Sequence, residues 1–85
     1  MAHSTEYAPP AEKQIDALPG DLQKRIAAAV KKLENNPRPP GCKKLKRFDD
    51  TYRIRVGDYR IVYEIHDTVL IVLVIRIAHR SGVYR

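Results

Sequence analysis

Three arginines are spaced along the sequence so that a β-hairpin would bring their side chains together. Arg53 and Arg55 lie two residues apart, and Arg60 follows Gly57-Asp58, a pair typical of a two-residue type II′ turn. Such a turn pairs Arg55 with Arg60 and Arg53 with Val62, on one face of two strands. Because like charges directly opposite each other cost about 0.2–1 kcal/mol, we expect this face to bind a phosphate or an acidic partner. The alternative is that the guanidinium groups spread into solvent, and a one-residue slip would divide them between two faces.

The end of the chain supplies other reactive groups: an imidazole, a phenol and two guanidinium groups, from His79, Arg80, Tyr84 and Arg85. RNA cleavage requires deprotonation of a 2′-hydroxyl, stabilisation of charge on the phosphorane and protonation of the departing 5′-oxygen. Arginines suit the second step, and a histidine or tyrosine suits the other two. Simpler interpretations exist, because an isolated histidine is more often structural, and Tyr84 equally fits packing or base stacking.

The elements that must position these groups follow from hydrophobic periodicity. From residue 52 the period is two, which predicts strands at residues 52–56 and 59–66. After a turn at Asp67-Thr68, residues 69–77 are apolar on both faces, as in a central buried strand. These strands follow one another in meander order.

The first part of the chain predicts a short edge strand at residues 3–7 and two helices. Pro9 and Pro10 suit the first turn of a helix that continues through Leu18 and stops at Pro19-Gly20. An apolar stripe predicts a second, amphipathic helix through Leu22, Ile26, Val30 and Leu33. The expected fold class is α+β, with an N-terminal strand and a helical hairpin packed on a twisted antiparallel β-sheet.

The charge distribution and the length of the chain limit which partners and how many domains we expect. Residues 1–37 carry five basic and five acidic side chains, and residues 38–85 carry eleven and five, so the net charge of +6 lies in the second part. This excess favours nucleic acid, an acidic protein or an anionic membrane as partner. At 85 residues we expect one domain, 1–85.

Cysteine usage and hydropathy indicate the compartment. Cys42 is the only cysteine, so no intramolecular disulfide can form, and it has no second metal ligand nearby. The N-terminus lacks a signal-peptide pattern, and the longest apolar run, residues 69–75, is far shorter than the ~20 residues of a membrane helix. We expect a cytoplasmic protein that enters no membrane and has no metal or cofactor.

Several stretches form a recognisable combination: Leu45-Lys46, Tyr52-Arg53-Ile54-Arg55, Tyr59-Arg60-Ile61-Val62-Tyr63, a hydrophobic strand, His79-Arg80 and Val83-Tyr84-Arg85. With the break at Leu18-Pro19 between the helices, the combination covers nearly the whole chain. It resembles the RelE branch of the RelE/ParE toxin superfamily. The resemblance implies a single RelE-like toxin domain with the RelE-like microbial ribonuclease fold.

The resemblance also implies an activity and partners. RelE-type toxins of type II toxin-antitoxin systems are ribosome-dependent endoribonucleases that cut mRNA in the A site and inhibit translation. The 2′-hydroxyl attacks the adjacent phosphate without a metal, leaving a 2′,3′-cyclic phosphate and a 5′-hydroxyl. The implied partners are the 70S ribosome, mRNA and a cognate RelB-like antitoxin that covers the basic surface.

Site residues are implied by position. Arg60 and Arg80 would hold the scissile phosphate, with Arg80 also a candidate to protonate the leaving oxygen, and Tyr84 would orient the nucleotide. Arg55 departs from the family, since the best-known members carry lysine there and an arginine cannot act as a general base. We therefore hypothesise that His79 or Tyr84 assists deprotonation while the arginines stabilise charge. The residues expected to bind RNA are Arg53, Lys44, Lys46, Arg47 and Arg85.

Two alternatives share this fold and charge. ParE-type proteins poison DNA gyrase by binding and do not cut RNA, and a non-catalytic nucleic-acid-binding module is also conceivable. The joint presence of Arg60, Arg80 and Tyr84 favours the RelE interpretation, because the gyrase poisons generally lack this set.

Overall fold

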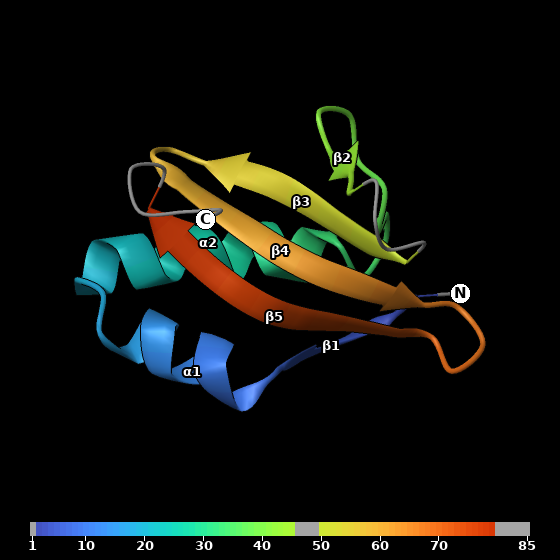
Figure 1. Cartoon of the computed structure of the whole chain (residues 1–85), viewed down its shortest axis with the longest axis horizontal. Helices are drawn as coiled ribbons and strands as arrows, with labels where there is room; N and C mark the ends of the chain where they lie inside the picture. The colour runs from blue at the N-terminus through green and yellow to red at the C-terminus, as the bar shows by residue number, and fades with distance from the viewer. Residues whose placement is uncertain (1, 46–49, 80–85) are drawn as a thin grey trace.

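The computed structural model describes residues 2–45 and 50–79 of the 85-residue chain (Figure 1). The strands form one sheet in the order β1-β5-β4-β3-β2. No helix in this part of the chain is long and apolar enough to cross a membrane. The elements in chain order are β1 (Ser4–Tyr7), α1 (Pro9–Asp16), α2 (Gly20–Lys32), β2 (Lys43–Lys44), β3 (Thr51–Val56), β4 (Tyr59–His66) and β5 (Ile71–His79).

The expected α+β fold is confirmed, with one difference in the sheet. Neighbours from β2 to β5 are antiparallel, but β1 runs parallel to β5, with Ser4 opposite Ile71 and Tyr7 opposite Val74. The sheet is therefore mixed. A hairpin fixes its own antiparallel direction through a short turn, whereas the direction of β1 depends on a strand at the other end of the chain.

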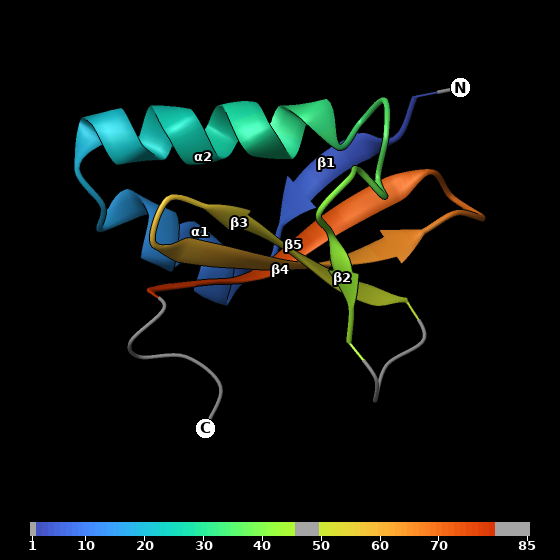
Figure 2. The same ribbon diagram turned by 90° about the horizontal axis from the view of Figure 1, so that it is seen from above.

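The two helices bury one core against one face of the sheet, and α2 lies along that face (Figure 2). The predicted stripe on α2 is confirmed, because Ile26, Val30 and Leu33 are at most 1% exposed. Burial of each such side chain contributes about 1.5–3 kcal/mol. The opposite face carries no helix in the described part of the chain. The core residues are Ala11, Ile26, Val30, Leu33, Ile61, Tyr63, Ile65, Val72, Val74 and Ile77.

The end of α1 differs from the expectation. The helix begins at Pro9 and Pro10 as predicted, but it ends at Asp16, so Leu18 lies beyond it and packs against the core from the connection to α2. One side chain of α1 reaches the sheet, because the amide oxygen of Gln14 accepts a hydrogen bond from the backbone N–H of Ile77 at 2.7 Å. This bond ties α1 to the end of β5.

The connection between β4 and β5 is also longer than expected. It occupies residues 67–70, with Leu70 at φ 57°, so β5 begins at Ile71 and Val69 is left 62% exposed. Within the pair, Tyr63 lies opposite Val74 but Val62 lies opposite Arg76. One extra residue on β5 forms this bulge, and it reverses the face to which every later residue of the strand points.

Candidate functional site

The β3–β4 hairpin has the two-residue turn that the sequence predicts. Gly57 adopts φ 58°, which a type II′ turn requires at its first central position. Across the turn Arg55 pairs with Arg60, and Arg53 pairs with Val62. The register that brings the three arginines to one face is confirmed.

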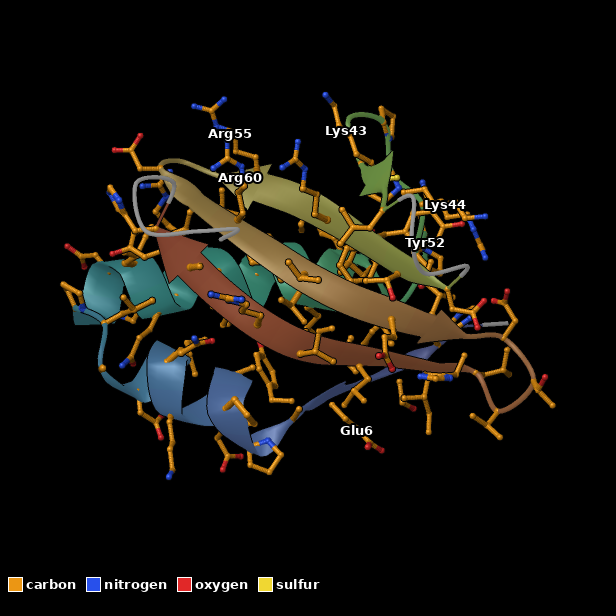
Figure 3. The ribbon with its side chains drawn as sticks, in the orientation of Figure 1. Glu6, Lys43, Lys44, Tyr52, Arg55 and Arg60 are labelled. Carbon is orange, nitrogen blue, oxygen red and sulfur yellow. The ribbon has the colours of Figure 1, made fainter. Side chains whose placement is uncertain are left out.

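These arginines line a hollow of about 250 Å³ on the open face of the sheet, which we call the arginine pocket. Its lining residues are Gly41, Lys43, Arg53, Ile54, Arg55 and Arg60. Lys43 comes from β2, where it lies opposite Arg53. Arg53 and Arg60 are half-buried, and Arg55 and Lys43 are exposed. Figure 3 shows Arg55 and Arg60 projecting from the neighbouring strands β3 and β4, with β2 and Lys43 beyond β3.

The electrostatics of the arginine pocket favour an anion. No carboxylate is among its described lining residues. Arg55 donates from Nε to the carbonyl oxygen of Gly57 at 3.1 Å. Glu64, an acid on this face, contacts Nε2 of His66 at 2.9 Å near the other end of β4. Guanidinium groups that converge on a hollow suit the bidentate binding of a phosphate.

A further cation reaches the same face because of the bulge in β5. Arg76 is exposed and lies opposite Val62, which is itself opposite Arg53. The sequence did not indicate Arg76 as a site residue. Counting alternate residues along β5 gives the wrong face for Arg76, because the bulge interrupts the alternation just before it.

The same bulge places His79 on the helix-covered face of the sheet. His79 pairs with Tyr59, and Ala78 pairs with Arg60. The His79 ring stands edge-on to the Tyr59 ring, with centroids 5.2 Å apart and an interplanar angle of 86°. An unbroken register would have put His79 on the face of Arg60. The structure thus does not bring this predicted proton-transfer residue to the arginine pocket.

The loop that carries β2 is held by polar contacts to the sheet. The Tyr63 hydroxyl donates to the carbonyl oxygen of Pro37 at 2.7 Å. Arg38 donates to the Tyr52 hydroxyl at 3.2 Å and to the carboxylate of Asp67 at 3.0 Å. The hydrogen bond from Arg38 is the main cause that lowers the pKa of the Asp67 carboxyl below its usual value. These contacts fix the loop from which Lys43 enters the pocket.

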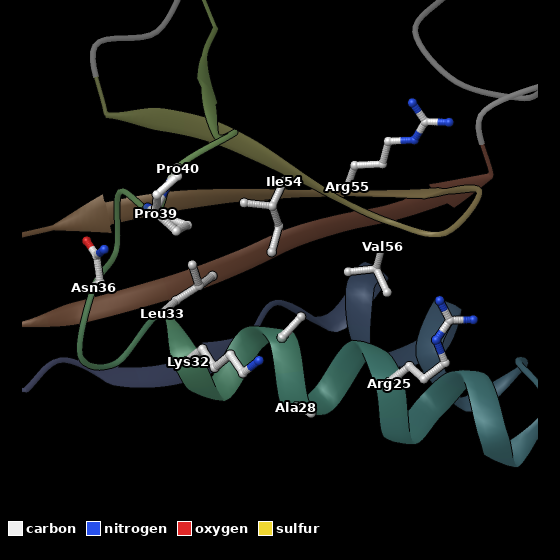
Figure 4. Close-up of a pocket in the computed structure, with 11 residues that line it drawn as sticks. Arg25, Ala28, Lys32, Leu33, Asn36, Pro39, Pro40, Ile54, Arg55 and Val56 are labelled. Atoms are coloured by element: carbon white, nitrogen blue, oxygen red, sulfur yellow. The ribbon is translucent and has the colours of Figure 1, made fainter.

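A second, larger hollow of about 710 Å³ lies between α2 and β3 (Figure 4). Unlike the arginine pocket it has a largely apolar floor, and basic side chains stand at its margin. It shares Ile54 and Arg55 with the arginine pocket, so the two hollows flank the same stretch of β3. Its floor includes Ala28, Leu33, Ile54 and Val56, and its margin includes Arg25, Lys32 and Arg55.

The family model described as "ParE toxin of type II toxin-antitoxin system, parDE" matches residues 5–84. The chain belongs to this toxin family. Among its relatives, Toxin RelE3 of Methanocaldococcus jannaschii is 34% identical over 76 residues, which cover 85% of this chain and 84% of the relative. A putative RelE-like toxin protein of Escherichia coli is 32% identical over 88 residues, covering 99% and 92%. The resemblance to the RelE branch is confirmed.

Solved structures of this toxin family share the fold. The archaeal RelE-RelB complex from Pyrococcus horikoshii OT3 matches with a TM-score of 0.84 at 24% identity, covering 98% of this chain and 100% of that chain. The RelB-RelE antitoxin-toxin complex from Methanococcus jannaschii matches with a TM-score of 0.70 at 30% identity, covering 89% and 91%. The five-stranded sheet with two helices is thus a RelE-type fold.

The predicted site residues of this RelE/ParE toxin divide into three groups. Arg53, Arg55 and Arg60 meet in the arginine pocket. Lys44 and His79 are described but do not line the pocket, because Lys44 pairs with Tyr52 and His79 pairs with Tyr59. Lys46, Arg47, Arg80, Tyr84 and Arg85 lie outside the described residues.

Proposed function

We propose that this RelE/ParE toxin is an endoribonuclease that cuts mRNA on the ribosome and thereby inhibits translation. The observation that carries the proposal is the arginine pocket, in which three arginines fixed by one hairpin register and a lysine from β2 surround a hollow large enough for a phosphate. The kinship with toxins named RelE supports the choice of RNA as substrate.

The proposed reaction is the attack of a 2′-hydroxyl on the adjacent phosphate. Arg53, Arg55 and Arg60 stabilise the negative charge that builds up on the phosphorane, a role that suits positioned cations. From the family resemblance we assign Arg80 to the same phosphate and to stabilisation of the charge on the leaving oxygen, and Tyr84 to the orientation of the nucleotide. The products are a 2′,3′-cyclic phosphate and a 5′-hydroxyl.

The proposed partners are the ribosome, mRNA and a RelB-like antitoxin in the cytoplasm. Solved relatives are described as complexes of RelE with RelB, which supports an antitoxin for this chain. An acidic antitoxin segment over the arginine pocket would neutralise the cations that RNA otherwise contacts. Occupation of the pocket by the antitoxin would therefore keep the toxin inactive.

Sequencing RNA ends after incubation with programmed 70S ribosomes tests the proposal. We expect cuts in register with the codon in the A site. The double variant Arg53→Gln/Arg60→Gln should lose them while keeping the thermal stability of the wild type within a few degrees. Intact RNA with active ribosomes and wild-type protein would overturn the proposal.

A second candidate follows from the match to the ParE toxin family. A gyrase poison would bind its protein target and leave RNA uncut. Supercoiling by purified DNA gyrase, measured with the same preparation, separates the two functions. Inhibited supercoiling together with intact RNA would favour the ParE-type function.

A further inference from the structure

Attack by a 2′-hydroxyl needs a group that takes up its proton, and the arginines of the pocket cannot do this. A guanidinium has a pKa above about 12 and stays protonated at any pH at which the enzyme works. His79 lies on the opposite face, beside Tyr59. The other lining residues besides Lys43 are Gly41 and Ile54, which carry no titratable group. Among the described residues that line the pocket, Lys43 alone can exchange a proton with a substrate.

The backbone fixes where Lys43 enters the pocket. Lys43 pairs with Arg53, and the N–H of Leu45 donates to the carbonyl oxygen of Thr51 at 2.9 Å, so β2 is held in register on both sides of Lys44. The preceding turn uses Gly41 at φ 89°. The side chain is exposed, so a substrate can reach its amine.

The order of the strands places Lys43 on one side of any phosphate that binds between the arginines. Arg60 lies on β4, Arg53 and Arg55 lie on β3 in the middle, and Lys43 lies on β2 (Figure 3). In phosphoryl transfer the attacking and leaving oxygens lie roughly in line on opposite sides of phosphorus. A phosphate held by the central arginines therefore has Lys43 on one flank and Arg60 on the other.

We propose that Lys43 is the general base of this toxin, an inference that rests on the proposed ribonuclease function. The uncharged amine accepts the proton of the 2′-hydroxyl while the 2′-oxygen forms its bond to phosphorus. The bond between phosphorus and the 5′-oxygen breaks, and the 5′-oxygen takes a proton from solvent. Lys43 then releases its extra proton to water, so the enzyme returns to its starting state.

The substitution Lys43→Arg separates charge from proton transfer, because it keeps a cation in the pocket but removes the base. We expect single-turnover cleavage on programmed ribosomes to fall about 10² to 10⁴ fold, with ribosome binding within threefold of wild type. The wild-type rate should rise with pH over the range in which ribosomes stay active, and the variant should lose that rise. Lys13→Arg, an exposed lysine on α1, is the matched control and should cleave like wild type.

A substrate with sulfur in place of the bridging 5′-oxygen identifies which proton Lys43 moves. A thiolate leaves without protonation, so loss of a general acid is largely relieved on this substrate, whereas loss of a general base is not. We expect Lys43→Arg to remain impaired to the same degree on the sulfur substrate. Recovery to near the wild-type rate would overturn the assignment as base.

The outcomes also separate this inference from the proposed function. Equal rates and equal pH profiles for wild type and Lys43→Arg, with cleavage by both, would overturn the role of Lys43 and leave the ribonuclease function intact. Absence of cleavage by wild type would overturn both. Lys43→Gln serves as a second variant, which should lose the base as well as the charge and cleave no faster than Lys43→Arg.

Discussion

Single charges decide what the arginine pocket can bind. Arg60 stands on β4, an inner strand of the sheet, directly opposite Arg55, and its side chain is half-buried. Coulombic interactions strengthen as water is excluded, so a half-buried guanidinium should stabilise a developing negative charge more than an exposed one. We therefore expect Arg60 to contribute more to transition-state stabilisation than the exposed Arg55.

Replacement of Arg60 tests this ranking. Arg60→Gln removes the charge while keeping a polar side chain, and we expect RNA cleavage to fall about 10² to 10³ fold, as when one positioned donor of an anion site is lost. Arg55→Gln should cost less. Arg25→Gln, on α2 across the larger hollow, should stay within threefold of wild type. A loss at Arg55 greater than that at Arg60, measured as kcat, would contradict the ranking.

The sequence alone predicts the positions of some of the site residues but not of others. The positions of Arg53, Arg55 and Arg60 follow from one local turn, so pattern and register agree. Lys43 was missed because β2 has two residues, too few for any periodicity to be visible. The face of His79 could not be foreseen, because it depends on a bulge in the pairing of β4 with β5.

At the scale of elements, the β3–β4 turn carries the site. Its first residue, Gly57, has φ 58°, and a Cβ there would lie 3.3 Å from Nη2 of Arg25. A change in this turn would alter the register that places the arginines opposite each other. The hairpin is thus a structural requirement for anion binding as well as for the sheet.

Substitution Gly57→Ala should destabilise the fold by about 1–2 kcal/mol, the cost of a left-handed conformation for a residue with a Cβ. Gly20→Ala is the matched control, since no heavy atom lies within 4 Å of its Cβ position at the start of α2. That control should be neutral or stabilise by up to about 1 kcal/mol. Chemical denaturation measures both values, and equal stability of the two variants would contradict this account of the turn.

The loop that carries Lys43 should respond to pH through Asp67. Arg38 holds the pKa of this carboxyl below its ordinary value, so the folded state favours the ionised form. The resulting stabilisation is present above the unfolded-state pKa of about 3.9 and is lost as the pH falls through the lower folded-state value. We expect Asp67→Asn to be less stable than wild type at pH 7 and equally stable near pH 2. A difference in unfolding free energy that does not shrink with acid would contradict this assignment.

Prediction from sequence succeeded for elements with local determinants. The proline start of α1, the apolar stripe of α2 and the alternation of β3 and β4 each depend on neighbouring residues. The parallel pairing of β1 and the late start of β5 depend on contacts that close only in the folded chain. Non-local pairing therefore explains most of the differences.

At the scale of the whole molecule, the fold separates stability from recognition. The helices and the core occupy one face of the sheet, and the arginine pocket lies on the other. Glu6 on the edge strand β1 lies far across the sheet from the pocket (Figure 3). An anion is attracted to the side of the sheet with β2, β3 and β4. The charge asymmetry of the sequence, with the net +6 in residues 38–85, predicted this polarity.

The chemistry of the cut RNA end tests the central claim most directly, because it reports which oxygen attacked the phosphate. Mass spectrometry of the upstream fragment from programmed ribosomes should find a 2′,3′-cyclic phosphate, with a 5′-hydroxyl on the downstream fragment. The Arg60→Gln protein should yield the same ends in much smaller amount. A 5′-phosphate on the downstream fragment, or uncut RNA with the wild-type protein, would contradict the account.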